Sequence, residues 1–175
     1  MPILVIPDPA LVLVVGAAGS GKSTLAARLF APDEIVSSDA LRAVVSGDEA
    51  DQRVSGVAFR ILHRIVDRRL AEGRLTVVDA TNAAATVRRP LLQRARRHAV
   101  PSVAIVLDLD ARIVHAQNAA RARIVDPDVI DRHLGAIRRT VDGGGLVAEG
   151  VDHVIVLRDP VDIAALVVQR RLARA

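Results

Sequence analysis

The chain has 175 residues, of which 51% are hydrophobic, and its formal net charge is +4. That length fits one domain with a sizeable core, and that hydrophobic content excludes a disordered chain. There is no cysteine, which excludes disulfides, thiol chemistry and the usual structural zinc sites. The mild positive charge is compatible with a nucleotide or nucleic-acid partner but does not point to one.

The N-terminal stretch MPILVIPDPALVLVV is apolar, but Pro7-Asp8-Pro9 interrupts it and no positively charged segment precedes it. These features are not typical of a signal peptide. No apolar run reaches the roughly 18 residues that a membrane span needs. We therefore expect a cytoplasmic protein without a membrane partner.

Strands and helices are predicted to alternate along the chain. Apolar runs of strand length occupy residues 11–15, 34–37, 75–78, 103–107 and 154–157, the last of these being the final strand. Helices are expected over residues 23–30, from 39 onward, over 53–70, 86–98, 111–122 and 127–141, and after Asp159-Pro160, with a glycine turn at 143–145. Since the strands are apolar on both faces, the pattern predicts an α/β fold with a covered parallel sheet, as one domain over residues 1–175.

Residues 16–23, GAAGSGKS, fit the phosphate-binding pattern G-x-x-x-x-G-K-[ST] and lie where it must lie, between a strand and a helix. The predicted nucleotide ligands here are Gly16, Gly19, Ser20, Gly21, Lys22, Ser23 and Thr24. Lys22, the chain's only lysine, would reach the β- and γ-phosphates of ATP, and the Ser23 hydroxyl would ligate Mg²⁺. A compact ammonium suits this loop better than a planar guanidinium. A glycine-rich turn that matches by chance is disfavoured by the context.

The segment Ser37-Ser38-Asp39-Ala-Leu-Arg42 follows the second predicted strand. Asp39 would lie at the carboxyl edge of the sheet, where it could accept the proton of an attacking hydroxyl. Arg42, three residues on, could hold an acceptor phosphate. A helix N-cap is an equally good interpretation of Asp39 on this segment alone.

The segment Val77-Val78-Asp79-Ala-Thr81-Asn82 ends the third predicted strand. Asp79 could support Mg²⁺ or its waters. It could also simply end the strand and cap the next helix. Thr81 and Asn82 favour the first interpretation, because they add polar groups at the same edge.

Arg121 and Arg123 flank a predicted break between two helices, a layout that a mobile arginine lid over ATP would need. For this segment alone, a solvated arginine face is the better interpretation, because the chain is rich in arginine.

Taken together, these segments resemble the kinase module of bacterial polynucleotide 5′-hydroxyl kinases. The matching pieces follow the family order over residues 6 to about 133: the strand leading into GSGKSTLA, then SSDALR, then VDATN followed by Arg88, then NAARARIVDPDVI. The lid departs from the family in two respects: its arginines are one residue closer together, and Gln117 stands where the family usually has arginine. The phosphatase and ligase modules of the end-repair enzymes have no counterpart, so a free-standing kinase is expected.

The resemblance implies a P-loop kinase-type five-stranded sheet of order 2-3-1-4-5, with strands counted along the chain, and a helical lid at about residues 112–133. It implies Asp39 as general base, Arg42 on an acceptor phosphate, and Arg121 and Arg123 on ATP. Lys22 and Ser23 are then the triphosphate and metal residues, with Asp79 beside the metal. Thr81, Asn82 and Arg88 belong to the substrate side. It also allows a homodimer or homotetramer.

Three functions follow in order of preference. The first is an ATP- and Mg²⁺-dependent kinase acting on the 5′-hydroxyl of RNA or DNA, although only two phenylalanines are present to stack bases. The second is a small-molecule phosphotransferase acting on a sugar, an antibiotic or a nucleotide-sugar. The third is a nucleotide-binding regulatory protein with weak turnover, which the intact Lys22, Ser23, Asp39 and Asp79 disfavour.

Overall fold

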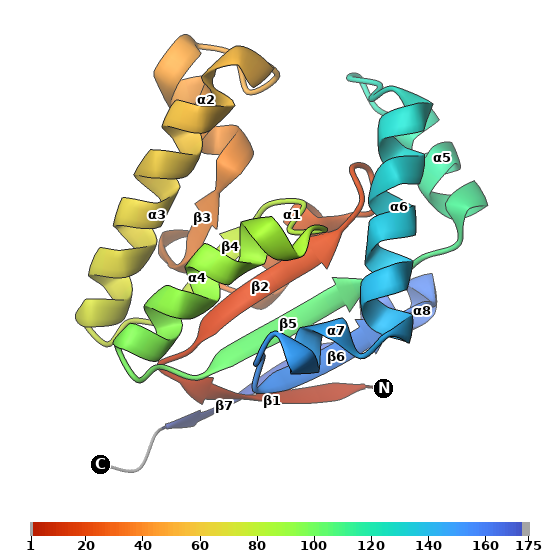
Figure 1. Cartoon of the computed structure of the whole chain (residues 1–175). Coiled ribbons are helices and arrows are strands. Elements are labelled where there is room, and N and C mark those ends of the chain that lie inside the picture. The colour runs from red at the N-terminus through yellow and green to blue at the C-terminus, as the bar shows by residue number, and fades with distance from the viewer. Residues whose placement is uncertain (1, 173–175) are drawn as a thin grey trace.

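A computed structural model describes residues 2–172 and contains a five-stranded, wholly parallel sheet of order β3-β4-β2-β5-β6 (Figure 1). The strands are β2 (Leu11–Gly16), β3 (Ile35–Ser37), β4 (Thr76–Asp79), β5 (Ser102–Leu107) and β6 (His153–Leu157). Counted along the chain as the five predicted strands, this is the order 2-3-1-4-5. The predicted α/β fold class and sheet order are therefore confirmed.

Helices cover both faces of this sheet, and single turns of 3₁₀ helix precede β3 and α3 (Figure 1). The helices are α1 (Lys22–Leu29), α2 (Ser38–Ser46), α3 (Ser55–Ala71), α4 (Ala85–Arg97), α5 (Ala111–Ala119), α6 (Pro127–Asp142), α7 (Gly145–Ala148) and α8 (Pro160–Ala165). None of the helices within residues 2–172 is both long and apolar enough to cross a membrane.

The central strand β2 shows why both faces of the sheet are covered. All six of its residues are buried. Because successive side chains of a strand point to opposite faces, Leu11 and Leu13 pack into one core cluster, whereas Val12 and Val14 pack into the other. The first cluster receives apolar side chains of α3, α4, α6 and α7, and the second those of α1.

Two strands outside the main sheet were not predicted. Strand β1 (Ile3–Asp8) pairs in parallel with β7 (Val167–Leu172), and together they close over the second cluster through Leu4 and Ile6. Residues 154–157 do lie in a strand, β6, but β7 follows it along the chain. The prediction that they form the final strand is therefore wrong. Helix α7 was also missed, directly after the predicted glycine turn.

The predicted helix start at Asp159-Pro160 is confirmed. Asp159 is the N-cap of α8, where its Oδ1 accepts a hydrogen bond of 2.7 Å from the Val161 N–H, and Pro160 occupies the first helical position.

Above the carboxyl ends of β2, β3 and β4, the pair α2–α3 rises on one side and the pair α5–α6 on the other (Figure 1). In a parallel α/β sheet this is the edge at which ligands bind. The P-loop, Asp79 at the end of β4, Asp39 near the start of α2, and Arg121 and Arg123 all lie at this edge.

Candidate active site

A cavity of about 1190 Å³ opens at this edge of the sheet. Its wall collects most of the predicted site residues: Gly19, Ser20, Gly21, Lys22, Ser23, Thr24, Asp39, Arg42, Asp79, Thr81, Asn82, Arg121 and Arg123. Of the predicted set, only Gly16 and Arg88 do not line it. The space is large enough for a nucleotide together with part of a second substrate.

The P-loop is shaped for close approach of phosphates. Gly19 and Gly21 have φ angles of 83° and 88°, which strain any residue with a side chain. A Cβ at Gly16 would lie 2.5 Å from the Ser20 Oγ, so this glycine supports the loop from behind although it does not face the cavity. No side chain caps the first turn of α1. The N–H groups of that turn are therefore free to donate to an anion.

Lys22 lies at the first position of α1, and its ammonium donates a 2.7 Å hydrogen bond to the Ala17 carbonyl across the loop. Burial of the ammonium lowers the pKa of Lys22 to about 8, with the positive charge of Arg121 acting in the same direction and the carboxylates of Asp79 and Asp39 opposing. The side chain thus lies within the electrostatic reach of Asp79, Asp39 and Arg121. Phosphate anions placed beside it would restore its charge.

Asp79 ends β4 and is buried, which raises its pKa, although hydrogen bonds from the Ser23 and Ser37 hydroxyls and the charge of Lys22 act against the rise. Within residues 2–172 no group of three or more His, Asp or Glu side chains could hold a metal by itself. A hydroxyl and one carboxylate suit Mg²⁺, which keeps several waters and takes its other ligands from substrate phosphates. Ser23 and Asp79 therefore fit the magnesium site predicted for them.

Asp39 is the second residue of α2, and the helix N-cap is Ser37, whose Oγ accepts a hydrogen bond of 3.4 Å from the Ala40 N–H. The capping interpretation of Asp39 is therefore wrong. The Asp39 carboxylate, half exposed at the cavity wall, instead pairs with the buried guanidinium of Arg42. Arg42 also donates a 2.7 Å hydrogen bond to the Glu49 carbonyl, which fixes its orientation.

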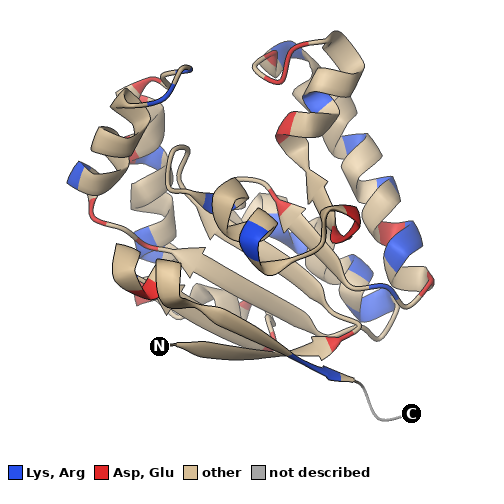
Figure 2. Cartoon of the chain, turned by 180° about the vertical axis from the view of Figure 1, so that it is seen from behind, with Lys and Arg blue, Asp and Glu red and all other residues tan. Residues whose placement is uncertain are grey.

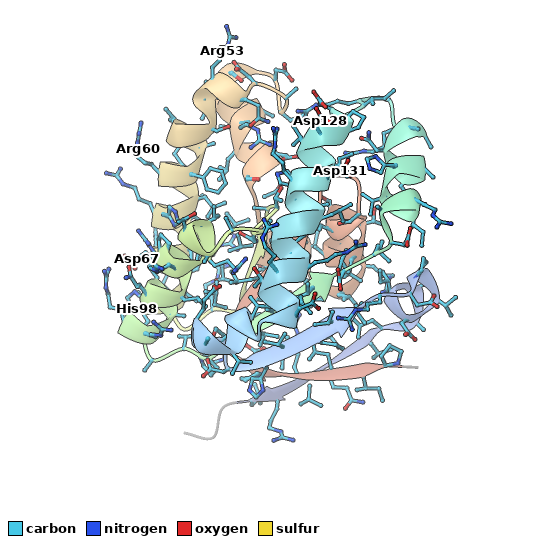
Figure 3. All side chains as sticks on the ribbon, turned by 45° about the vertical axis from the view of Figure 1, so that its right-hand side comes forward. Arg53, Arg60, Asp67, His98, Asp128 and Asp131 are labelled. Atoms are coloured by element: carbon cyan, nitrogen blue, oxygen red, sulfur yellow. The ribbon has the colours of Figure 1, made fainter. Side chains whose placement is uncertain are left out.

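The segment predicted to be a lid, at about residues 112–133, comprises most of α5, the turn after it and the first half of α6. The Asn118 side chain closes this turn through two hydrogen bonds to the Val125 backbone, of 2.8 and 2.9 Å. His115 of α5 donates to the Asp131 carboxylate of α6 at 2.7 Å, and Figure 3 shows Asp131 on the side of α6 that faces α5. Arg121 and Arg123 extend from this braced turn into the cavity wall.

Thr81 and Asn82 hold the edge of the sheet together. The Thr81 carbonyl accepts a hydrogen bond from the Gly16 N–H at 3.1 Å. The buried Asn82 amide donates to the carbonyls of Val14 and Val78, at 2.9 and 3.3 Å, so it ties β2 to β4. Both residues line the cavity, but these contacts make them supports of the P-loop.

Arg88 does not face the cavity, which is a correction to the predicted substrate contact. Its guanidinium is completely buried and forms a two-pronged ion pair with Glu149, at 2.8 and 2.5 Å. It also donates to the carbonyls of Asn82 and Ala83, each at 2.7 Å. Arg88 therefore anchors the loop after β4 to α4 and to the residue that follows α7.

The cavity wall also contains residues that the sequence did not single out: Arg28, Gln52, Phe59, Val129, His133 and Ile163 among them. Arg28 donates to the carbonyls of Ile163 and Leu166, at 2.6 and 2.9 Å, and so joins α1 to α8 at one end of the cavity. His133 faces in from α6, where burial and the charge of Lys22 lower its pKa. No local motif distinguishes these residues, because the fold alone brings them together.

The sequence profile of a family described as AAA domain matches residues 11–143 of the chain. No curated protein sequence matches the chain. Solved structures with similar folds do exist, and the three described next have low sequence identity.

A chain of the Pnkp1/Rnl/Hen1 RNA repair complex is 19% identical with a TM-score of 0.67, and the match covers 79% of this chain and 47% of that one. The protein thus spans about half the length of that relative. A gluconokinase from Sinorhizobium meliloti 1021 is 15% identical with a TM-score of 0.57, covering 91% and 88% of the two chains. A sugar kinase from Janibacter sp. HTCC2649 is 19% identical with a TM-score of 0.58, covering 90% and 91%. At such identities the matches show the fold only.

Proposed function

Since the chain belongs to the AAA domain family, whose profile spans residues 11–143, and has a P-loop kinase-type fold, we propose that it transfers the γ-phosphate of ATP to the 5′-hydroxyl of a polynucleotide. One observation carries this proposal. A carboxylate that does not cap its helix, Asp39, lies in the same cavity wall as the P-loop lysine and pairs with an arginine suited to an acceptor phosphate.

In the proposed reaction, the 5′-oxygen attacks the γ-phosphorus while the bond from that phosphorus to the β,γ-bridging oxygen breaks. Asp39 takes the proton of the hydroxyl, and ADP leaves with the bonding electron pair. Lys22 and the free N–H groups of α1 stabilise the charge on the β- and γ-phosphates. Mg²⁺ held at Ser23 and Asp79 would neutralise part of that charge.

The lid and the acceptor side complete the assignment. Arg121 and Arg123, which line the cavity, would neutralise charge on the transferring group, and the turn that carries them is braced by Asn118. Arg42 would contact the phosphate next to the reacting nucleoside. The resemblance of four chain segments to polynucleotide kinases, together with a similar fold in an RNA repair complex, supports a nucleic-acid acceptor.

A small-molecule acceptor is the second candidate, and one observation favours it. Phe59 is the only aromatic ring other than histidine in the cavity wall as described, so the stacking surface for bases is small. Two of the similar structures are sugar kinases by name. A regulatory protein that binds ATP with little turnover is the third candidate.

One assay separates the three candidates. The protein is incubated with ATP labelled at the γ-phosphate and Mg²⁺, against a 5′-hydroxyl oligonucleotide and, in parallel, a panel of sugars and nucleosides. Label on the oligonucleotide that disappears in the Asp39→Asn variant supports the polynucleotide acceptor. Label only on a member of the panel supports the second candidate, and slow hydrolysis without any transfer supports the third.

A further inference from the structure

A second, smaller cavity of about 460 Å³ lies on the outer side of α3, against α4. We call it the arginine groove, and its wall is formed by Val57, Arg60, Ile61, His63, Arg64 and Arg94. Half of these residues are arginines, and none carries a carboxylate. Figure 2 shows basic positions following one another along α3.

The arginines of this groove differ in having no acidic partner from two other arginines nearby, Arg53 in the turn before α3 and Arg68 on α3. Arg53 pairs with Asp51 and Arg68 with Glu72, each at 2.9 Å. Within residues 2–172, by contrast, no carboxylate lies within 4.0 Å of the guanidinium of Arg60, Arg64 or Arg94. Arg60 extends from α3 away from the rest of the molecule (Figure 3).

Asp67 of α3, whose carboxylate is within reach of the Arg94 charge, is already engaged by other partners. Asp67 accepts hydrogen bonds from His98 at 3.0 Å and from Arg97 at 3.5 Å, and Figure 3 shows Asp67 and His98 side by side. The positive charge of the arginine groove is therefore left for an anion from outside the chain.

Unpaired polar atoms inside the groove point to the same kind of ligand. The Nε of Arg94 and the Nδ1 of His63 are both buried and have no hydrogen-bond partner in the part of the chain that is described. Buried polar groups are rarely left unpaired in native proteins. Arg94 also donates from Nη1 to the Pro90 carbonyl at 2.7 Å, so only its other donors are free. Once these shielded side chains turn toward the groove, a phosphate oxygen could accept from the Arg94 Nε, and from His63 in the tautomer protonated at Nδ1.

The groove adjoins the active-site cavity. Phe59 lines that cavity and is followed directly by Arg60 of the groove. The ring of Phe59 also contacts the ring of His63, with their centroids 6.4 Å apart. Consecutive residues of α3 therefore line the two cavities from different faces of the same helix.

We propose that the arginine groove binds a backbone phosphate of the acceptor polynucleotide, beyond the nucleotide whose 5′-hydroxyl reacts. The proposal rests on the proposed function and makes its substrate more specific: an oligonucleotide rather than a mononucleotide. Guanidinium groups match phosphate geometry, and contacts to the backbone carry no sequence information. The groove should therefore make the affinity for an acceptor depend on its length and not on its sequence.

Kinetics with two acceptors test this assignment. The double variant Arg60→Gln/Arg64→Gln is expected to lose about tenfold or more in kcat/KM with a 5′-hydroxyl 12-mer and to stay within about twofold with a nucleoside 3′-monophosphate, which is too short to reach the groove. The slope of log affinity against log salt should fall by about 0.7 for each backbone phosphate that the variant no longer binds. Arg53→Gln/Arg68→Gln removes the same charge from the 3₁₀ turn before α3 and from α3 itself, and should leave the kinetics with both acceptors unchanged. Equal losses in the two double variants, or equal losses for the two acceptors, would overturn the proposal.

Fluorescence anisotropy of a dye-labelled 12-mer gives a readout that does not need catalysis. Suppose that the wild-type protein binds the 12-mer, that Arg60→Gln/Arg64→Gln weakens this binding, and that no acceptor is phosphorylated. Phosphate binding by the groove is then supported, and the proposed reaction is refuted. If the wild-type protein phosphorylates the 12-mer, and the double variant binds and phosphorylates it equally well, then the proposed reaction is supported and phosphate binding by the groove is refuted. Absence of both transfer and binding refutes both.

Discussion

At the scale of single residues, Lys22 predicts a pH dependence of ATP binding. Its pKa is about 8 in the free protein, and the phosphates of ATP should raise it. Binding therefore takes up most of one proton at pH 9 and little at pH 7, and affinity falls as the pH rises through 8. Calorimetry in two buffers of different ionisation enthalpy measures the uptake. The Lys22→Arg variant should show no such proton uptake, because its guanidinium does not titrate in this pH range. It should also lose phosphoryl transfer. Activity within a few-fold of wild type would contradict the role of Lys22.

Asp39 supports a second prediction at this scale. Asp39→Asn should leave ATP affinity nearly unchanged and slow transfer by roughly 10²- to 10⁴-fold, because the amide cannot take the proton of the hydroxyl. The fold should survive, since Ser37 caps α2. Calorimetry with ATP and Mg²⁺, set beside an oligonucleotide transfer assay, separates the two effects. Transfer that persists in Asp39→Asn would mean that another group accepts the proton.

At the scale of elements, the lid predicts a difference between two arginines. Arg121→Ala should slow transfer by about ten- to a hundredfold with any acceptor, since its guanidinium lines the cavity near Lys22. Arg112→Ala removes an exposed arginine from α5 of the same lid and should have no effect. Steady-state kcat/KM for ATP compares them. Equal rates would favour the solvated arginine face that the sequence alone suggested.

Elements near the P-loop could be predicted from sequence because each carries a local signal. The apolar run of β2 ends in the glycines of the loop, and β4 ends in Asp79. The strand β7 carries no such signal, since its sequence VVQRRL contains two arginines and stays largely exposed. Arg88 could not be assigned correctly, because its partner Glu149 lies 61 residues away in sequence. Phe59 and His133 reach the cavity only through the packing of their helices, which no short pattern encodes.

At the scale of the whole molecule, the ion pair of Arg88 with Glu149 predicts a loss of stability. Arg88→Met should lower the free energy of unfolding by about 3 kcal/mol, because Glu149 loses its partner and two carbonyls lose their donor. Its exposed neighbour provides the control, since Arg89→Met should change the stability by less than about 0.5 kcal/mol. Urea denaturation measures both. The KM of the folded Arg88→Met protein for its acceptor should be unchanged. A raised KM would instead support the sequence-based prediction that Arg88 contacts the substrate.

The pairing of β1 with β7 sets the order in which the protein can be completed during synthesis. Ile3 lies opposite Val167, so the ribosome makes β1 before the whole main sheet and β7 after it. Until β7 emerges, β1 has no partner strand, and the apolar side chains of Leu4 and Ile6 lack part of their cover. The P-loop and the lid belong to segments made in between. The nascent chain can therefore assemble its nucleotide site first, while β1 remains a target for chaperones that bind extended apolar segments.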